Sequence, residues 1–262
     1  MSSDTYLRLR RMHDALFAAY GPQHWWPTQP DPAQSGSDTR FEVIVGAYLT
    51  QNTSWKAVER SLEALRMANA LSIEGMRGLS LARLQELIRS SGFITRKAPA
   101  LRAFLALLDS EFSGSLDAMT AAPTAALRGR LLALSGVGPE TADAILLYAL
   151  GHPVPVADEY LRRIAERHGL LHSPVPRNTR SYEALAALTS AAFAQEPVES
   201  KRRLFNEFHA LAVAVGKAHC GSTPRCENCP LAPDLDPALR RRLSTAASCT
   251  SKTEPSHRSA WE

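Results

Sequence analysis

No run of about 18 apolar residues occurs in this 262-residue sequence, which excludes an ordinary membrane-spanning helix. The first residues, M-S-S-D-T-Y-L-R-L-R-R, also lack the apolar stretch of a signal peptide, so a cytoplasmic location is expected. Polar–apolar alternation and β-branched runs are scarce, and we therefore predict an all-α protein. With 45% hydrophobic and 21% charged residues, the composition excludes fibrous and wholly disordered classes.

Cysteine is scarce as well. The chain has 4 cysteines, and three of them lie together at Cys220, Cys226 and Cys229. A disulfide framework is unusual in a cytosolic protein, whereas clustered thiols in a reducing compartment favour a metal site. The net charge of +4 and the pI near 9.0 permit a polyanionic partner such as nucleic acid without requiring one.

Helical periodicity recurs along most of the chain. We predict helices over 4–20, 39–50, 54–67, 72–76, 81–90, 95–110, 123–133, 139–150, 157–168, 180–195 and 201–217. Ser80 is a good helix cap, and Ser115 or Asp117 predicts the start of another short turn. After Pro230 the pattern weakens, and residues 233–262 are expected to be poorly ordered.

The most informative segment is L-S-G-V-G-P-E-T-A, at 134–142 between two helical patterns. Gly136 and Gly138 permit backbone conformations closed to other residues, and Pro139 suits the first turn of a helix. Val137 is expected to enter the core and fix the turn. The segment predicts a helix–turn–helix whose free amides bind an anion such as phosphate. For the two glycines alone, a plain αα-hairpin is the alternative.

Four further motifs accompany this hairpin: L-T-Q-N-T-S-W-K at 49–56, G-F-I-T-R-K-A at 92–98, V-A-D-E-Y-L-R-R-I at 156–164 and C-x5-C-x2-C-P at 220–230. In this order they resemble the endonuclease III branch of the helix-hairpin-helix DNA glycosylase superfamily, most closely the endonuclease III-type 3-methyladenine DNA glycosylases. The resemblance covers roughly residues 20–232.

The resemblance implies a two-lobed, all-α fold with DNA between the lobes. One lobe would be a six-helix block over 38–150 that ends in the hairpin. The other would combine 1–37 with 151–232 and carry the Cys-rich loop, followed by the tail at 233–262.

Asp158 opens the predicted helix that follows the hairpin. From its position alone it is a good helix cap, and the resemblance implies that it is the catalytic aspartate. A fixed carboxylate stabilises the positive charge that builds on the sugar when an N-glycosidic bond breaks, and it can orient or deprotonate water.

Where relatives that cut the DNA backbone carry a lysine, this chain has Glu140. A carboxylate cannot form the Schiff base that strand cleavage needs, so the resemblance implies a monofunctional glycosylase with little lyase activity. Lys56 and Lys97 lie near the expected cleft, but their spacing does not mark a nucleophile. The resemblance also implies that Glu140 lies beside the base pocket; alternatively it is an exposed acid at a helix N-terminus.

The remaining DNA contacts follow from the resemblance. Gln51 and Asn52 lie on a loop between two helices and are expected to bind DNA. Gln51 would fill the gap left by the extruded base, and Phe93 would be the wedge on the opposing loop. Alternatively, Phe93 is a core aromatic. Phosphate contacts are expected from Gly136, Val137, Gly138 and Thr141.

Trp25 and Trp26 lie in a loop rich in proline and glutamine. The resemblance implies that they form part of the damaged-base pocket, where an indole face would attract a cationic methylated purine. Alternatively, they anchor the loop by burying their rings on the first helix.

The Cys-rich loop resembles the loop that holds a [4Fe-4S] cluster in endonuclease III, which needs four ligands. The position of the family's fourth cysteine reads Leu235 here, and Cys249 is the remaining cysteine. Three interpretations stay open: a cluster completed by Cys249, a cluster or zinc site completed by another ligand such as His219, and a metal-free loop. In each of them the loop is structural and carries Arg225 toward DNA phosphates.

The sequence therefore predicts a base-excision-repair DNA glycosylase, monomeric and associated with the nucleoid, acting on double-stranded DNA that contains a damaged base. Alkylated purines are the first expectation. The alternatives are an enzyme for oxidised pyrimidines or mismatched bases, and a helix-hairpin-helix protein that binds DNA without chemistry.

Overall fold

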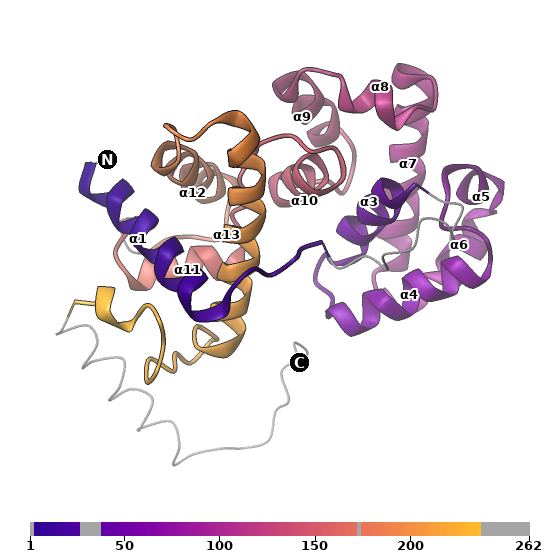
Figure 1. The fold of residues 1–262 in the computed structure, drawn as a ribbon. Coiled ribbons are helices and arrows are strands. Elements are labelled where there is room, and N and C mark those ends of the chain that lie inside the picture. The colour runs from indigo at the N-terminus through magenta and orange to yellow at the C-terminus, as the bar shows by residue number, and fades with distance from the viewer. Residues whose placement is uncertain (1–2, 27–37, 172–173, 237–262) are drawn as a thin grey trace, which may run out of the picture. The chain divides into compact units, whose positions relative to one another are not determined.

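The computed structural model describes residues 3–26, 38–171 and 174–236, and every regular element in these ranges is helical (Figure 1). The all-α prediction is confirmed. No helix in the described ranges is both long enough and apolar enough to cross a membrane.

The chain divides into two compact units. The described part of the first unit comprises the residues up to Trp25 together with those from Pro153 onward, and the second unit extends from Trp26 to His152. The two neighbouring tryptophans therefore belong to different units.

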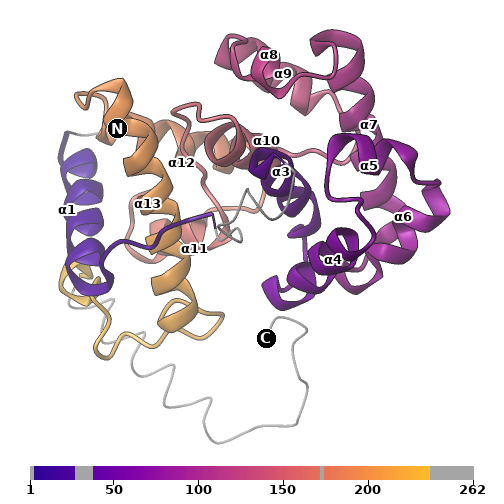
Figure 2. The ribbon, with the colours of Figure 1, turned by 45° about the vertical axis from the view of Figure 1, so that its right-hand side comes forward.

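The second unit is built around helix α3 (Thr39–Leu49), in which every residue from Phe41 to Leu49 is buried. It is followed by α4 (Trp55–Met67), α5 (Ile73–Gly78), α6 (Leu81–Leu87), η1 (Arg89–Ser91), α7 (Ile94–Phe112), α8 (Leu116–Thr120), α9 (Thr124–Leu132), α10 (Pro139–Ala144) and η2 (Ile145–Ala149). Helix α3 packs against α4, α7, α10 and η2 (Figure 2). The hydroxyls of Ser80 and Ser115 cap α6 and α8, as their sequence positions predict.

The segment predicted as one helix over 139–150 differs from that expectation. Its second half, η2, is a π-helix, in which the amide of Leu150 bonds to the carbonyl of Ile145, five residues back. One extra residue in a turn leaves the apolar pattern almost unchanged, so periodicity could not reveal it. Turns of this type often occur at functional sites.

The first unit contains α1 (Ser3–Tyr20), α11 (Glu159–Arg167), α12 (Thr179–Ala192), α13 (Val198–Ala218) and η3 (Ala232–Asp234). Helix α13 packs against α1 and α11, and α12 packs against the same two helices (Figure 1). Gly216 of α13 permits the close approach to α11, because a Cβ there would lie 2.1 Å from the Tyr160 ring.

The tail begins later than predicted. Asp234 and Leu235 are packed into the first unit, since Leu235 is buried and Asp234 forms ion pairs. The expectation of poor order is wrong for residues 233–236, and its remainder, over 237–262, lies outside the described residues.

Candidate DNA-binding and catalytic site

The predicted hairpin connects α9 to α10, and its two glycines differ in backbone conformation. Gly136 has φ +83°, a conformation that favours glycine, and Val137 is buried as expected. Gly138 does not need glycine for its backbone, because its φ of −94° is open to any residue, so the sequence-based interpretation is wrong there. A Cβ on Gly138 would meet no atom within 4 Å. Its small size leaves open space beside the start of α10.

Gln51 is tied to this hairpin. It lies in the loop between α3 and α4, as predicted, and its Nε2 donates hydrogen bonds to the Gly136 carbonyl and to Thr141 Oγ1, each at 3.0 Å. The next residue, Asn52, has φ +50°. The structure therefore brings together the turn glycine, Thr141 and the loop residue predicted to enter the DNA stack.

Phe93 stands at the surface. It is 56% exposed and has φ +48° at the position before α7. The core-aromatic alternative is therefore wrong. A left-handed conformation in a bulky residue costs about 1–3 kcal/mol and is typical of functional sites. Its exposed aromatic ring is accessible, as the predicted wedge role requires.

Lys97 links the two loops, a role that its sequence position did not reveal. It is only 3% exposed, and its Nζ donates to the Leu49 carbonyl (2.7 Å), to Thr53 Oγ1 (2.8 Å) and to the Ser91 carbonyl (2.8 Å). Burial lowers the pKa of Lys97 to about 8. The same ammonium group lies 5.9 Å from the centroid of the Phe93 ring.

Trp26 and Glu140 lie in the same unit as the hairpin. The Trp26 ring contacts those of Trp55 and Tyr148, at centroid distances of 5.7 and 5.2 Å. Gly46 of α3 makes room for it, since a Cβ there would lie 3.1 Å from the indole. These ring contacts are with residues of the second unit, whereas the loop-anchor alternative expects contacts with the first helix. Glu140 is exposed in the first turn of α10.

Asp158 lies in the first unit, at the cap of α11. Its Oδ1 accepts a hydrogen bond from the amide of Leu161 at 2.8 Å, and the residue is 7% exposed. It is therefore a true helix cap, as its position alone predicted. A cap uses one of the two carboxylate oxygens, so this role leaves Oδ2 available for chemistry.

A histidine that the sequence did not single out faces this carboxylate. His209 of α13 is buried, and its Nε2 lies 3.6 Å from Asp158 Oδ2. The edge of the Trp25 ring meets the histidine ring at 5.5 Å between centroids. Trp25 therefore packs against α13. No local motif marks His209, because it contacts Asp158 only through the packing of α11 on α13.

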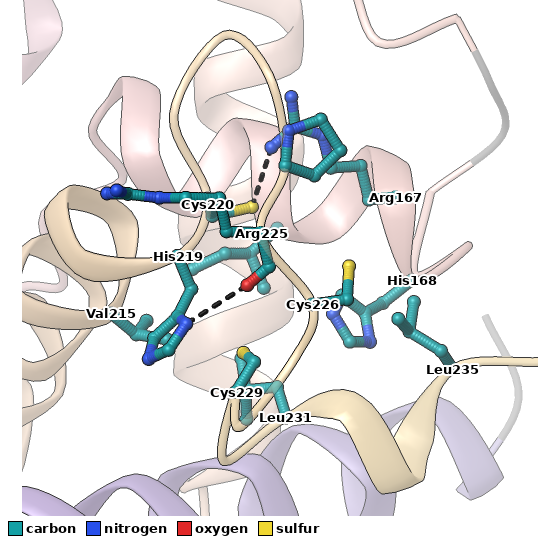
Figure 3. Close-up of a pocket in the computed structure, with 12 residues that line it drawn as sticks. Arg167, His168, Val215, His219, Cys220, Arg225, Cys226, Cys229, Leu231 and Leu235 are labelled. Carbon is teal, nitrogen blue, oxygen red and sulfur yellow. Dashed lines mark hydrogen bonds between the residues drawn. The ribbon is translucent and has the colours of Figure 1, made fainter. Parts of the chain in front are cut away.

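The Cys-rich loop after α13 surrounds one pocket (Figure 3), lined by Cys220, Cys226 and Cys229. Arg167 donates a hydrogen bond to the Cys220 sulfur at 2.9 Å, and burial raises the pKa of Cys229. Leu235, at the position of the family's fourth cysteine, also lines the pocket. His219 turns its Nδ1 to the Arg225 carbonyl at 3.0 Å.

The described residues alone do not complete a cluster site. Three thiols fall short of four ligands, and no three His, Cys, Asp or Glu side chains in the described ranges are arranged to hold a metal ion. Cys249, the other candidate ligand, lies outside the described residues.

Ion pairs anchor the end of the Cys-rich loop. Arg8 of α1 donates to both carboxylate oxygens of Asp234, at 3.1 and 2.7 Å, and His168 Nδ1 donates to Oδ2 at 3.0 Å. Arg8 also donates to the His168 carbonyl at 2.9 Å. The residue before Leu235 is thus bound to two helices.

Comparison with known proteins identifies the family to which the chain belongs. The model of the HhH-GPD superfamily of base excision DNA repair proteins matches residues 45–187, a range that contains Gln51, Phe93, the hairpin and Asp158. The chain belongs to this family.

Individual relatives agree. MJ1434 of Methanocaldococcus jannaschii, named as a DNA repair glycosylase, is 33% identical over 88% of this chain and 97% of its own length. Endonuclease III of Bacillus subtilis is 23% identical over 73% of this chain and 78% of its own.

Among solved structures, the H. pylori 3-methyladenine DNA glycosylase MagIII, bound to 1,N6-ethenoadenine, has a TM-score of 0.65 and 26% identity, covering 82% of this chain and 97% of MagIII. An endonuclease III–DNA complex shares the fold, with a TM-score of 0.70, 20% identity and coverage of 93% and 100%. The protein is a DNA repair glycosylase of the HhH-GPD family.

Proposed function

We propose that the protein is a monofunctional glycosylase that hydrolyses the N-glycosidic bond of an alkylated base in double-stranded DNA. The observation that carries this proposal is the absence of a suitable amine at the hairpin in the described residues. Glu140 occupies the first turn of α10, and Lys97 Nζ donates to three acceptors in a buried position. An amine held in this way cannot attack a sugar carbon without breaking those bonds.

Asp158 supplies the charge that hydrolysis needs. As the bond to the base breaks, the sugar gains oxocarbenium-like positive charge, which a fixed carboxylate stabilises. The Leu161 amide holds Oδ1, while Oδ2 can orient the attacking water or accept its proton. A binding protein without chemistry has no need for such a group.

The loops of the second unit suit the handling of an extruded base. Gln51 is bonded to the hairpin, and the Phe93 ring lies 5.9 Å from the ammonium group of Lys97, so both side chains have partners within the protein before DNA arrives. Preorganisation lowers the entropy lost when a wedge enters the base stack. The amides at the start of α10 and the open space at Gly138 suit close contact with a phosphate.

The indoles and Glu140 support an alkylated base over a neutral one. A positively charged methylated purine gains cation–π attraction from an indole and Coulomb attraction from a carboxylate, whereas an ordinary purine gains neither. The likeness to MagIII, at 26% identity, supports the same choice.

For the Cys-rich loop we propose a structural role. The metal content of the purified full-length protein and of Cys249→Ser distinguishes the three open arrangements. Four irons that are lost in Cys249→Ser indicate a cluster completed by that thiol. Retention of metal in the variant indicates another ligand such as His219, and metal-free protein indicates a loop held by its ion pairs.

Incubation of the full-length protein with duplexes carrying one lesion each tests the proposed activity. Alkali treatment reveals abasic sites, and borohydride traps any Schiff base. We expect alkali-dependent cleavage at alkylated purines and no trapped adduct. Excision of oxidised pyrimidines or mismatched bases instead would support the alternative specificity, efficient trapping would contradict monofunctional chemistry, and binding without any excision would contradict the enzyme assignment.

A further inference from the structure

We propose that His209 is a positioning residue that fixes the orientation of the Asp158 carboxylate. The inference rests on the proposed function of Asp158 and extends it to a residue outside the matched family range, which ends at 187. It comes from a contact between two buried side chains on different helices.

In the Asp158 carboxylate, Oδ1 accepts a hydrogen bond, whereas Oδ2 needs a further contact to hold it in place. The Leu161 amide holds Oδ1 at 2.8 Å, but a single hydrogen bond still allows the group to tilt about the Cβ–Cγ bond. His209 Nε2 lies 3.6 Å from Oδ2, slightly beyond hydrogen-bond distance. Contacts of this type are often long in free enzymes and shorten when substrate binds.

Helix packing fixes the distance between the two groups. Gly216 brings α13 against Tyr160 of α11, where a Cβ would lie 2.1 Å from the ring. Asp158 begins α11 and His209 lies two turns before Gly216 in α13. Since neither helix can shift without disturbing this contact, the histidine is held at a constant distance from the carboxylate.

A second set of contacts holds the histidine ring. The Trp25 ring meets it edge-on at 5.5 Å, and Asn206, one turn earlier on α13, donates a hydrogen bond to the Trp25 carbonyl at 2.7 Å. Helix α13 thus fixes both His209 and the residue that restrains it. This supporting layer is what a catalytic group needs in order to keep its orientation.

The position of His209 Nε2 suits the chemistry. A hydrogen on Nε2 can be donated to Oδ2 while the negative charge stays on Asp158, which the developing sugar cation requires. A side chain that only fills space would donate no hydrogen bond to Oδ2 and so would not orient the carboxylate. The Nε2 donor is therefore the feature to test.

Two substitutions separate the donor from the bulk of the side chain. Glutamine can place an amide nitrogen near the Nε2 position, whereas the shorter asparagine cannot. We expect His209→Asn to slow single-turnover excision by about 10- to 100-fold, the effect of a small misplacement of a reacting group, and His209→Gln to recover most of the rate. Affinity for undamaged duplex is expected to stay at the wild-type value.

A double variant tests whether His209 affects the excision rate through Asp158. If His209 acts through Asp158, then His209→Asn slows the Asp158→Asn protein no further, because interacting residues are not additive. Because asparagine can place an amide nitrogen near the Nδ1 position, the matched control is His168→Met, which removes the buried Nδ1 contact with Asp234 in the same unit. We expect its folded fraction to excise at the wild-type rate.

The outcomes separate the two proposals. Wild-type excision by Asp158→Asn would overturn the catalytic assignment itself. If Asp158→Asn excises slowly but His209→Asn excises normally, or if His209→Asn slows the Asp158→Asn protein further, only the positioning role is wrong. Should His209→Asn fail to fold, His209→Met, which keeps bulk without a donor, must show the same slow excision relative to His209→Gln; equal rates in these two variants would overturn the inference.

Discussion

An aspartate–histidine pair lies at each end of helix α11. The residue next to α11 is the aspartate at its start and the histidine at its end. At its start Asp158 faces His209 at 3.6 Å, and just past its end His168 bonds to Asp234 at 3.0 Å. Both histidines are buried. The pairs differ in how fully the carboxylate is used, because both oxygens of Asp234 accept hydrogen bonds from Arg8 or His168, whereas the Asp158 contact leaves Oδ2 beyond hydrogen-bond distance.

Under the proposed function, this difference separates a structural carboxylate, Asp234, from a reactive one, Asp158. A carboxylate whose oxygens are all occupied contributes to stability, and any substrate would have to displace its partners. A buried carboxylate whose second oxygen has only a long contact gives up some stability and can still bind water or respond to a nearby cation. We therefore expect substitutions at the two ends to affect different measurements.

The largest effect is expected at the start of the helix. Asp158→Asn keeps an oxygen for the Leu161 amide but removes the charge, so excision should fall by at least about 100-fold, as for the loss of other preorganised electrostatic groups. Thermal stability and duplex affinity should change little. Single-turnover kinetics beside a binding titration check this, and a comparable loss in both would mean that Asp158 is chiefly structural.

At the other end, Asp234→Asn should reduce stability and leave chemistry intact. Loss of the charged hydrogen bonds to Arg8 and His168 is expected to lower the free energy of unfolding by about 2 kcal/mol. Denaturant unfolding measures this, and excision per folded molecule should equal that of wild type. If the folded Asp234→Asn protein excised more slowly than wild type, the assignment of a purely structural role to Asp234 would be contradicted.

The same variant has a pH signature. Burial acts to raise the pKa of Asp234, but hydrogen bonds from His168 and Arg8 outweigh it, so this pKa lies below its ordinary value. A lowered folded-state pKa stabilises the protein above the unfolded pKa, about 4, and this stabilisation is lost as the pH falls through the folded value. The stability difference between wild type and Asp234→Asn should therefore shrink below about pH 4.

Local sequence signals predicted the helices and the loop positions of Gln51 and Phe93, because apolar spacing and caps act within a few residues. They also predicted Asp158 as a cap. They could not predict His209, whose contact depends on how α13 packs on α11, or Lys97, whose three acceptors come from separate segments. The π-turn of η2 and the ordinary backbone of Gly138 were missed because neither alters the pattern of residue types.

A smaller effect is expected from the indoles. Trp25→Ala and Trp26→Ala should each reduce excision of a cationic methylated purine by about tenfold, or about 1.4 kcal/mol of cation–π attraction. Affinity for undamaged duplex should barely change, because phosphate contacts supply it. The Trp25 ring contacts that of His209, and the Trp26 ring contacts that of Trp55, so Trp25→Ala should slow excision of a neutral lesion more than Trp26→Ala does. Equal losses of excision and duplex affinity would mean that the rings only hold their loop.

The smallest effects are expected at the two hairpin glycines. As at the two ends of α11, one substitution should affect function and the other stability. Gly138→Ala suits the observed φ of −94° and meets no atom within 4 Å, so stability should stay level or rise by about 0.4–1 kcal/mol. The added methyl group should nevertheless hinder the approach of a phosphate and weaken binding to every duplex alike. Gly136→Ala is the matched control, because its φ of +83° strains an alanine and should cost about 1–2 kcal/mol of stability. Titration of damaged and undamaged duplexes, beside thermal melting of both variants, checks the distinction, and unchanged duplex affinity in Gly138→Ala would show that this turn does not approach DNA.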